Sequence, residues 1–324
     1  MLDVVSIGNA TIDTFICMKG KVKKGNLVLP TGSKEEIESI FYATGGGATN
    51  TATGFKRLGL KTGVLAAIGH DPAGQIILRE LREEGINTRM VMRLDDYKTA
   101  YSAILTGHGH DRIILVYGGA TRHLGEERRI HWTWLKQAKW IHLTSFHSKP
   151  GIIEKILGFA EKNGISVSFN PGMSEIRLGF KKLAPMLRKV DILLLNKNEA
   201  GLLTREKNVK KQLAKLQELV PIVVITDGKK GAHAFDGIWH YYKPSYDVKI
   251  ADTTGAGDAF HSGFVAAIVK GHTIEKALDY GNGNAQSTIM HFGAKNNLLT
   301  QREMELFLKE NEKQSTRAVK EKAC

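Results

Sequence analysis

The chain has 324 residues, 42% hydrophobic and 24% charged, a composition that argues against disorder and allows a large buried core. No apolar run approaches the ~20 residues that span a bilayer, and the N-terminus lacks the basic region of a signal peptide. The two cysteines, Cys17 and Cys324, lie near opposite ends and argue against a disulfide framework. We therefore expect a cytoplasmic protein without membrane contact.

The net charge of +13 raises the alternative of nucleic-acid binding. The Lys and Arg residues are scattered, however, and neither zinc-finger spacing nor an aromatic RNA-binding string occurs. We expect no nucleic-acid partner and interpret the charge as a solvated surface with a general attraction for phosphates.

Short apolar runs alternate with longer amphipathic segments along most of the chain. Expected strands cover residues 4–7, 63–68, 113–117, 140–144, 166–169, 192–195 and 222–226. Expected helices cover residues 48–58, 73–84, 151–162, 209–219, 256–270 and 274–289. Because the strand at 192–195 is apolar on both faces, it suits a parallel sheet covered on both sides. The pattern predicts an α/β fold with a doubly wound, mostly parallel sheet and helices on both faces.

Two segments, residues 13–33 and about 93–120, depart from this alternation. They mix apolar and polar residues between glycine-rich breaks, without a helical period. We expect one domain over residues 1–300, followed by a C-terminal helix and tail over residues 301–324.

The most informative motif is Asp-Thr-Thr-Gly-Ala-Gly-Asp at residues 252–258, at the start of the helix expected over 256–270. Backbone amides at a helix N-terminus attract anions, and Gly255, Ala256 and Gly257 leave room for close approach. Asp258 follows in the first turn, where it could accept a proton from a hydroxyl held beside the anion. A glycine turn followed by an acid can also be a simple helix start, which is the structural alternative.

The whole motif closely resembles the C-terminal signature of the ribokinase-like (PfkB) family of carbohydrate and nucleoside kinases. In that family the final Asp is the catalytic base and the preceding amides form an anion hole. The resemblance implies these roles for Asp258 and for Gly255, Ala256 and Gly257. It also implies a small β-sheet lid formed by residues 13–33 and 93–120. No P-loop motif occurs, so a P-loop mechanism is excluded.

Acceptor binding is implied for a second group of residues. Gly45-Gly46-Gly47-Ala48-Thr49-Asn50 resembles the other family signature, in which paired glycines and Asn contact sugar hydroxyls. Asp13 follows the first strand, where an acid could accept hydrogen bonds from vicinal hydroxyls or merely form a turn. The expected acceptor-binding residues are Asp13, Gly45, Gly46, Asn50 and Asn170. At this last segment Ser168 and Gly172 replace the acid and the Arg that the family often carries.

Nucleotide and metal sites are also implied by the resemblance. The expected nucleotide-binding residues are Asn196, Thr226, Gly228, Gly231 and Asn282. Glu199 would organise Mg²⁺ through water, although Asn196 and Glu199 could equally cap a helix. Asp252 and Thr254 occupy the position at which the family often holds a monovalent cation such as K⁺.

The sequence thus predicts a kinase that transfers the terminal phosphoryl group of ATP, with ADP as the alternative donor, to a hydroxyl of a sugar or nucleoside. A catalytically silent sugar- or nucleotide-binding regulator of the same fold is the alternative. A homodimer is expected, because the outer face of a lid sheet would otherwise remain exposed.

Overall fold

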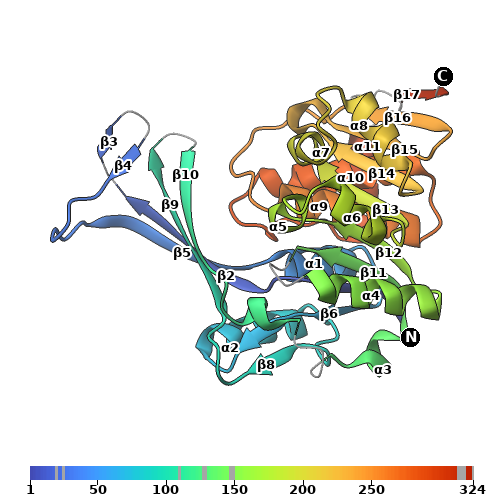
Figure 1. Cartoon of the computed structure of the whole chain (residues 1–324). Helices are drawn as coiled ribbons and strands as arrows, with labels where there is room; N and C mark the ends of the chain where they lie inside the picture. The colour runs from blue at the N-terminus through green and yellow to red at the C-terminus, as the bar shows by residue number, and fades with distance from the viewer. Residues whose placement is uncertain are drawn as a thin grey trace.

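The computed structural model describes residues 1–18, 21–23, 26–108, 111–125, 130–145, 150–311 and 319–322. A nine-stranded sheet forms the centre of the molecule (Figure 1). The strands from β14 through β6 run parallel, whereas β15, β16 and β17 extend one edge antiparallel. In spatial order the strands are β17 (Val319–Lys322), β16 (Trp239–Lys243), β15 (Ala232–Phe235), β14 (Ile222–Thr226), β13 (Ile192–Asn196), β12 (Ser166–Asn170), β11 (Ala138–Thr144), β1 (Leu2–Ile7) and β6 (Thr62–Leu65).

Helices cover both faces of this sheet. The α-helices are α1 (Gly47–Arg57), α2 (Pro72–Glu83), α3 (Trp132–Leu135), α4 (Pro150–Asn163), α5 (Met173–Ile176), α6 (Phe180–Leu187), α7 (Lys197–Thr204), α8 (Val209–Gln217), α9 (Ala256–Val269), α10 (Ile274–Ile289) and α11 (Gln301–Glu310). Among the described residues, the short 3₁₀ helices η1 (Gly119–His123) and η3 (Gly228–Lys230) lie in connections.

Strand β13 explains why the sheet needs two helical layers. Its side chains alternate between two buried clusters, because successive residues of a strand point to opposite faces. Leu193 and Leu195 pack in the cluster that includes α4, α6, α7 and α8. Ile192 and Leu194 pack in the cluster that includes α1, α9, α10 and α11. The predicted doubly wound α/β fold is therefore confirmed.

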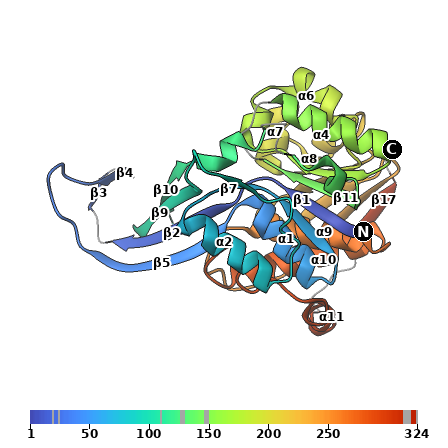
Figure 2. The same ribbon diagram turned by 90° about the horizontal axis from the view of Figure 1, so that it is seen from below.

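A second, smaller sheet extends from one side of this layered body (Figure 2). Its order is β10 (Asp111–Tyr117), β9 (Ala100–His108), β2 (Thr11–Met18) and β5 (Ile37–Gly45). Strands β2 and β9 are parallel, and the other two pairs are antiparallel. Strand β5 lies outside the two segments that the sequence predicted for a lid, so the sheet draws on a third segment.

Two short strand pairs complete the fold. β3 (Lys21–Lys23) pairs with β4 (Asn26–Val28), and β7 (Ala67–Gly69) pairs with β8 (Met92–Leu94). At the C-terminus the expected helix is present as α11, and β17 is an unexpected addition to the large sheet. Within the described residues, no helix combines the length and the apolar character needed to cross a membrane.

The small sheet is joined to the large one at the carboxyl end of β1. Only three residues separate β1 from β2, and a single residue, Gly46, separates β5 from α1. The carboxyl ends of parallel strands are where open α/β sheets bind ligands. The connections of the small sheet therefore pass directly through the expected site.

Candidate active site

The starts of two helices meet at the centre of the site. Helix α1 follows Gly46, and α9 follows Gly255, both with a positive φ that favours glycine (96° and 76°). Asn50, in the first turn of α1, donates from Nδ2 to Oδ2 of Asp258 in the first turn of α9, over 2.8 Å. These residues are 208 positions apart in the chain. The structure thus joins the two predicted signatures through one direct hydrogen bond.

Close packing between α1 and α9 keeps these two side chains in register. A Cβ atom on Gly54 would lie 2.2 Å from Oγ of Ser262, so the two helices approach where Gly54 has no side chain. Ser262 is fixed in turn by Asn284 of α10, whose Nδ2 donates to its Oγ over 3.1 Å. Ser262 and Asn284 are both fully buried. The distance between Asn50 and Asp258 therefore depends on a packed interface and not on two loops.

Asp13 lies next to the glycine-rich start of α1. A Cβ atom on Gly45 would come within 2.0 Å of Oδ2 of Asp13, so only glycine fits beside this carboxylate. A Cβ atom on Gly46 would lie 2.5 Å from the carbonyl oxygen of Asn9. Asp13 is only 8% exposed, although it sits on β2 of the small sheet. The predicted residues Asp13, Gly45, Gly46 and Asn50 are thus gathered at one place.

Both aspartates are electrostatically perturbed. Burial raises the pKa of Asp258, the hydrogen bond from Asn50 lowers it, and the negative charge of Asp13 raises it again. The net shift is upward, which favours proton acceptance near neutral pH. Burial also raises the pKa of Asp13, against the hydrogen bond from Ser102 and the charge of Lys295. The two carboxylates are therefore close enough to influence each other.

Lys295 is a charged residue near this site that the sequence analysis did not identify. Its side chain is 7% exposed, and its Nζ lies 2.6 Å from Oε1 of Glu80 and also contacts Oγ1 of Thr44. Thr44 is the neighbour of Gly45 on β5, so Lys295 supports the strand that leads to the glycines expected to bind the acceptor. Nothing in the local sequence Gly-Ala-Lys-Asn marked this lysine, because its partners come from β5 and α2.

The predicted nucleotide residues Asn196 and Thr226 lie side by side, at the ends of β13 and β14. Asn196 and Glu199 form a capping box at the start of α7. The Oε2 of Glu199 accepts from the backbone amide of Asn196 over 2.9 Å. In return, the Oδ1 of Asn196 accepts from the backbone amide of Glu199, also over 2.9 Å. Asn196 and Glu199 therefore do cap a helix, which was the structural alternative to nucleotide and metal binding. Burial and the negative charge of Asp258 raise the pKa of Glu199, so these two carboxylates lie close enough to interact electrostatically.

Four other predicted site residues, Gly228, Gly231, Asn170 and Asn282, differ in how they contact the backbone around them. Gly228 has a φ of 54° with open space around it, whereas a Cβ atom on Gly231 would lie 2.1 Å from the carbonyl oxygen of Lys243. Asn170 donates to the carbonyl of Leu194 over 2.9 Å. Asn282 donates to the carbonyl of Pro244 over 3.0 Å and is almost fully buried. The amides of Asn170 and Asn282 thus brace the backbone around the site.

Asp252 and Thr254 form a compact loop before α9. Oδ1 of Asp252 accepts from the amide and the hydroxyl of Thr254, over 3.0 and 2.8 Å. It also accepts from Nη1 of Arg112 on β10 over 2.7 Å, and the same nitrogen contacts the Thr254 hydroxyl. The amide of Ala256 donates over 3.3 Å to the carbonyl of Thr253, so one of the three predicted anion-hole amides is partly engaged.

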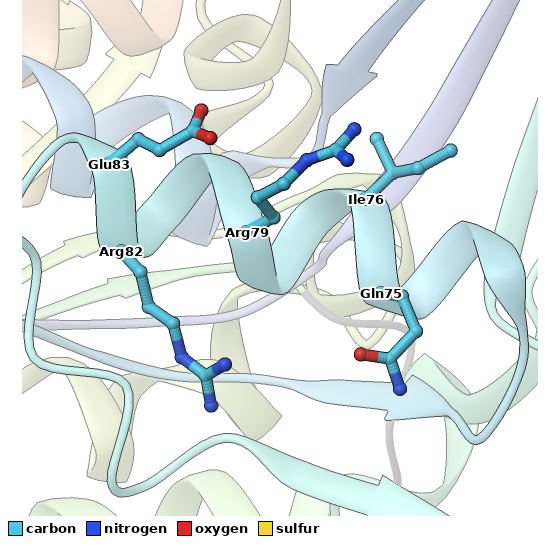
Figure 3. Close-up of a pocket in the computed structure, with 5 residues that line it drawn as sticks. All are labelled: Gln75, Ile76, Arg79, Arg82 and Glu83. Carbon is cyan, nitrogen blue, oxygen red and sulfur yellow. The ribbon is translucent and has the colours of Figure 1, made fainter.

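A surface hollow on α2 lies apart from these residues. Figure 3 shows its lining side chains, all from this one helix: Gln75, Ile76, Arg79, Arg82 and Glu83. None of them is a predicted site residue or contacts the Asn50–Asp258 pair, and we assign the hollow no role.

Comparison with known proteins shows the family of this chain. Residues 1–301 match the model of the pfkB family of carbohydrate kinases. The chain belongs to this family. It is 30% identical over 278 residues to an ATP-dependent ribose-1-phosphate kinase of Halopiger xanaduensis, covering 82% of this chain and 88% of that protein. It is accordingly a sugar or nucleoside kinase, a phosphotransferase with an alcohol acceptor.

Solved structures have the same fold. The nucleoside kinase of Methanocaldococcus jannaschii matches with a TM-score of 0.80 and 24% identity, over 95% of this chain and 99% of that one. The ribokinase of Arabidopsis thaliana, solved with ribose and ATP, matches with a TM-score of 0.82 and 21% identity, over 95% and 99%. These matches confirm a ribokinase-like fold for the kinase.

Replacing Gly54 with Ala tests whether helix packing sets the catalytic geometry. The added methyl group collides with Ser262, so we expect a loss of about 1–3 kcal/mol in stability. We also expect reduced turnover, because α1 and Asn50 shift away from Asp258. Thermal unfolding and steady-state kinetics measure both effects. Gly158→Ala is the matched control, since a Cβ atom there meets no atom within 4 Å. Unchanged turnover and unfolding in Gly54→Ala would show that the two helices can separate without cost.

Proposed function

We propose that this kinase transfers the γ-phosphoryl group of ATP to a hydroxyl of a sugar or nucleoside, with Asp258 as general base. The observation that carries the proposal is the 2.8 Å hydrogen bond between Asn50 and Asp258. It brings a residue expected to bind the acceptor to the residue expected to deprotonate it. The ribose unit is the first acceptor to consider, because relatives are named ribose-1-phosphate kinase, nucleoside kinase and ribokinase.

The proposed reaction begins with the acceptor hydroxyl beside Asp258. Asp258 accepts the hydroxyl proton, the hydroxyl oxygen forms a bond to the γ-phosphorus, and the bond from that phosphorus to the β,γ-bridging oxygen breaks. ADP leaves with the electron pair of the broken bond. General-base assistance of this kind is typically worth 10²- to 10⁴-fold in rate, roughly. The amides of Gly255 and Gly257, at the positive end of α9, would stabilise charge on the transferred group.

Asp13 and Asn50 would orient the acceptor. The Nδ2 of Asn50 is bound to Asp258, but its Oδ1 is buried without a partner among the described residues. The Oδ1 of Asn9, next to the acceptor glycines, is also a buried acceptor without a partner in the described part of the chain. Buried polar atoms normally have hydrogen-bond partners, so hydroxyl groups of a bound acceptor are suitable donors for both oxygens.

A Mg²⁺ ion that accompanies the nucleotide fits the residues present. Among the described residues, no group of three or more His, Cys, Asp or Glu side chains could hold a metal ion by itself. Mg²⁺ retains several waters and binds mainly phosphate oxygens in kinases, so such a cage is not required. Glu199 would contact its water shell, since the capping box occupies only Oε2. When bound, the ion would neutralise charge on the phosphates.

The small sheet is proposed to act as a lid. It places Asp13 in the site from β2, and β5 leads directly into Gly45 and Gly46. A lid over the acceptor excludes water, which would otherwise compete as phosphoryl acceptor.

A coupled assay of phosphoryl transfer tests this function. The panel contains ribose, other free sugars, ribose phosphates and nucleosides, each with Mg²⁺ and with ATP or ADP as donor. We expect turnover on one acceptor class and a loss of roughly 10²-fold or more in kcat for Asp258→Asn, because the base is removed. Asp247→Asn is the control for loss of a carboxylate elsewhere. Near-wild-type turnover in Asp258→Asn would refute the mechanism. Absence of turnover on every acceptor, with ATP still bound, would favour a silent regulator.

The pH dependence of kcat/KM gives a second test of the base. Rate falls as Asp258 becomes protonated, so its raised pKa places the acid limb above the usual range of an aspartate. Asn50→Ala removes a hydrogen bond that lowers the pKa of Asp258 and should move the limb to higher pH. Asp13→Asn removes a negative charge that raises the pKa and should move the limb to lower pH. Shifts in the same direction, or none, would contradict Asp258 as the titrating group.

We also propose that the kinase forms a homodimer through the small sheet. Exposed apolar side chains are concentrated on β5 and β10, among them Phe41, Leu115 and Val116. Exposed apolar surface on the two edge strands of the small sheet favours an interface, and a second copy presents the same surface. Sedimentation should show a dimer for the natural chain and a monomer for Val116→Lys. Leu202→Lys, at an equally exposed position on α7, should stay dimeric. A monomeric natural chain would refute the proposal.

A further inference from the structure

The loop that begins the anion hole contacts a cation supplied by the small sheet. Arg112 lies near the start of β10, and its partners Asp252 and Thr254 lie 140 and 142 residues further along the chain. The bond from Nη1 of Arg112 to Oδ1 of Asp252 is 2.7 Å long. The side chain of Asp252 is 8% exposed, and that of Arg112 is 31% exposed. The ion pair is therefore partly shielded from water, which strengthens it relative to a surface pair.

Asp252 connects three parts of the molecule. Its Oδ1 accepts from Arg112 of the small sheet and from Thr254 of its own loop. Its Oδ2 accepts from the amide of Gly293, beyond the end of α10, over 3.3 Å. The amides of Ala251 and Asp252 both donate to the carbonyl of Ile289, over 2.8 and 3.2 Å. The loop is thus held from three sides immediately before Gly255.

These contacts do not fit a bound monovalent cation. A K⁺ ion needs several oxygen ligands, and the side chains that the family resemblance assigns to it are Asp252 and Thr254. Hydrogen-bond donors already approach Oδ1 of Asp252 from three directions, and the Thr254 hydroxyl contacts the same guanidinium. A second positive ion at this place would be repelled by Arg112. The cation role suggested by the family resemblance is therefore not supported at Asp252 and Thr254.

We propose that the guanidinium of Arg112 takes the place of a monovalent cation in this kinase, so that catalysis is independent of K⁺. Arg112 acts here as a positioning residue: it fixes the loop that leads into Gly255-Ala256-Gly257. Because the arginine comes from β10, the small sheet supplies one of the contacts that hold this loop. This inference rests on the proposed function, since it concerns the geometry of the same anion hole.

The distribution of donors around Asp252 supports this assignment. Burial alone would raise the pKa of Asp252, but the hydrogen bonds from Thr254 and Gly293 and the charge of Arg112 together lower it. The carboxylate is therefore ionised and matched by a fixed positive charge. Arginine suits this role because its planar group donates to two acceptors at once and keeps its charge at any physiological pH.

The test compares the natural chain with Arg112→Met, Arg112→Lys and the control Arg93→Met, which removes one exposed positive charge on β8. Turnover is measured with Tris salts of ATP and increasing KCl, against tetramethylammonium chloride at constant ionic strength. We expect less than roughly a 2-fold effect of K⁺ on the natural chain. We expect Arg112→Met to lose roughly 10-fold or more in kcat, with a smaller change in KM, because the loop is misplaced. Added K⁺ or methylguanidinium should restore part of this loss, and Arg112→Lys should retain part of the activity.

Thermal unfolding supplies a readout that does not depend on turnover. An ion that binds only the folded state raises the midpoint of unfolding. K⁺ should therefore raise the midpoint of Arg112→Met relative to tetramethylammonium, and leave the natural chain and Arg93→Met unchanged.

Three results would overturn the inference: strong activation of the natural chain by K⁺, an Arg112→Met variant as fast as Arg93→Met, or a slow variant that neither small cations nor lysine restore. Failure of the proposed function is distinguishable, since the natural chain would then be inactive at every salt composition.

Discussion

The hydrogen bond between Asn50 and Asp258 is the contact on which the active site depends. It requires two helix N-termini to meet, each following a glycine in a conformation that other residues rarely adopt. The partial positive charge at both termini is directed toward the same space. This arrangement suits the proposed meeting of a polyanionic nucleotide with an acceptor hydroxyl, with the carboxylates of Asp13 and Asp258 placed to accept hydrogen bonds or a proton.

Small residues behind the site allow close helix packing, and this packing fixes the positions of Asn50 and Asp258. Gly54 faces Ser262, and Gly263 faces the backbone of Tyr280, so α1, α9 and α10 approach one another closely. A packed interface between rigid helices positions side chains more accurately than flexible loops do. The polar residues Ser262 and Asn284, which are fully buried in this interface, satisfy one another, and their hydrogen bond favours a single register between the helices.

The sequence predicted what local patterns determine. The apolar run at 192–195 indicated a strand covered on both faces, and the structure places its residues alternately in two cores. The signatures around Asn50 and Asp258 indicated one site, and these side chains are in contact. Strand β5 was missed because Ile37–Gly45 has a weak alternation and mostly exposed side chains. Its place is determined by pairing with β2, a contact between distant segments.

Long-range partners of charged groups were equally inaccessible to sequence reasoning. Asp252 was recognised as an acid with a candidate cation, but the cation beside it is Arg112, from a strand 140 residues earlier. Lys295 stands in a short polar segment without any motif, and its importance follows only from its burial beside Glu80 and Thr44. A motif specifies which group needs a partner, whereas the fold decides which residue supplies it.

The short connections between the two sheets have an evolutionary consequence. A rotation of the small sheet would bend the short segments Gly8–Ala10 and Gly45–Gly46, which also border Asp13, the proposed acceptor-binding carboxylate. If the small sheet closes as proposed, acceptor recognition and closure would share the same backbone. A mutation that adapts the pocket to a different acceptor would then also alter the angle at which the sheet closes. New specificities in such an enzyme should arise through paired changes, one in the pocket and one at the far contacts of the small sheet.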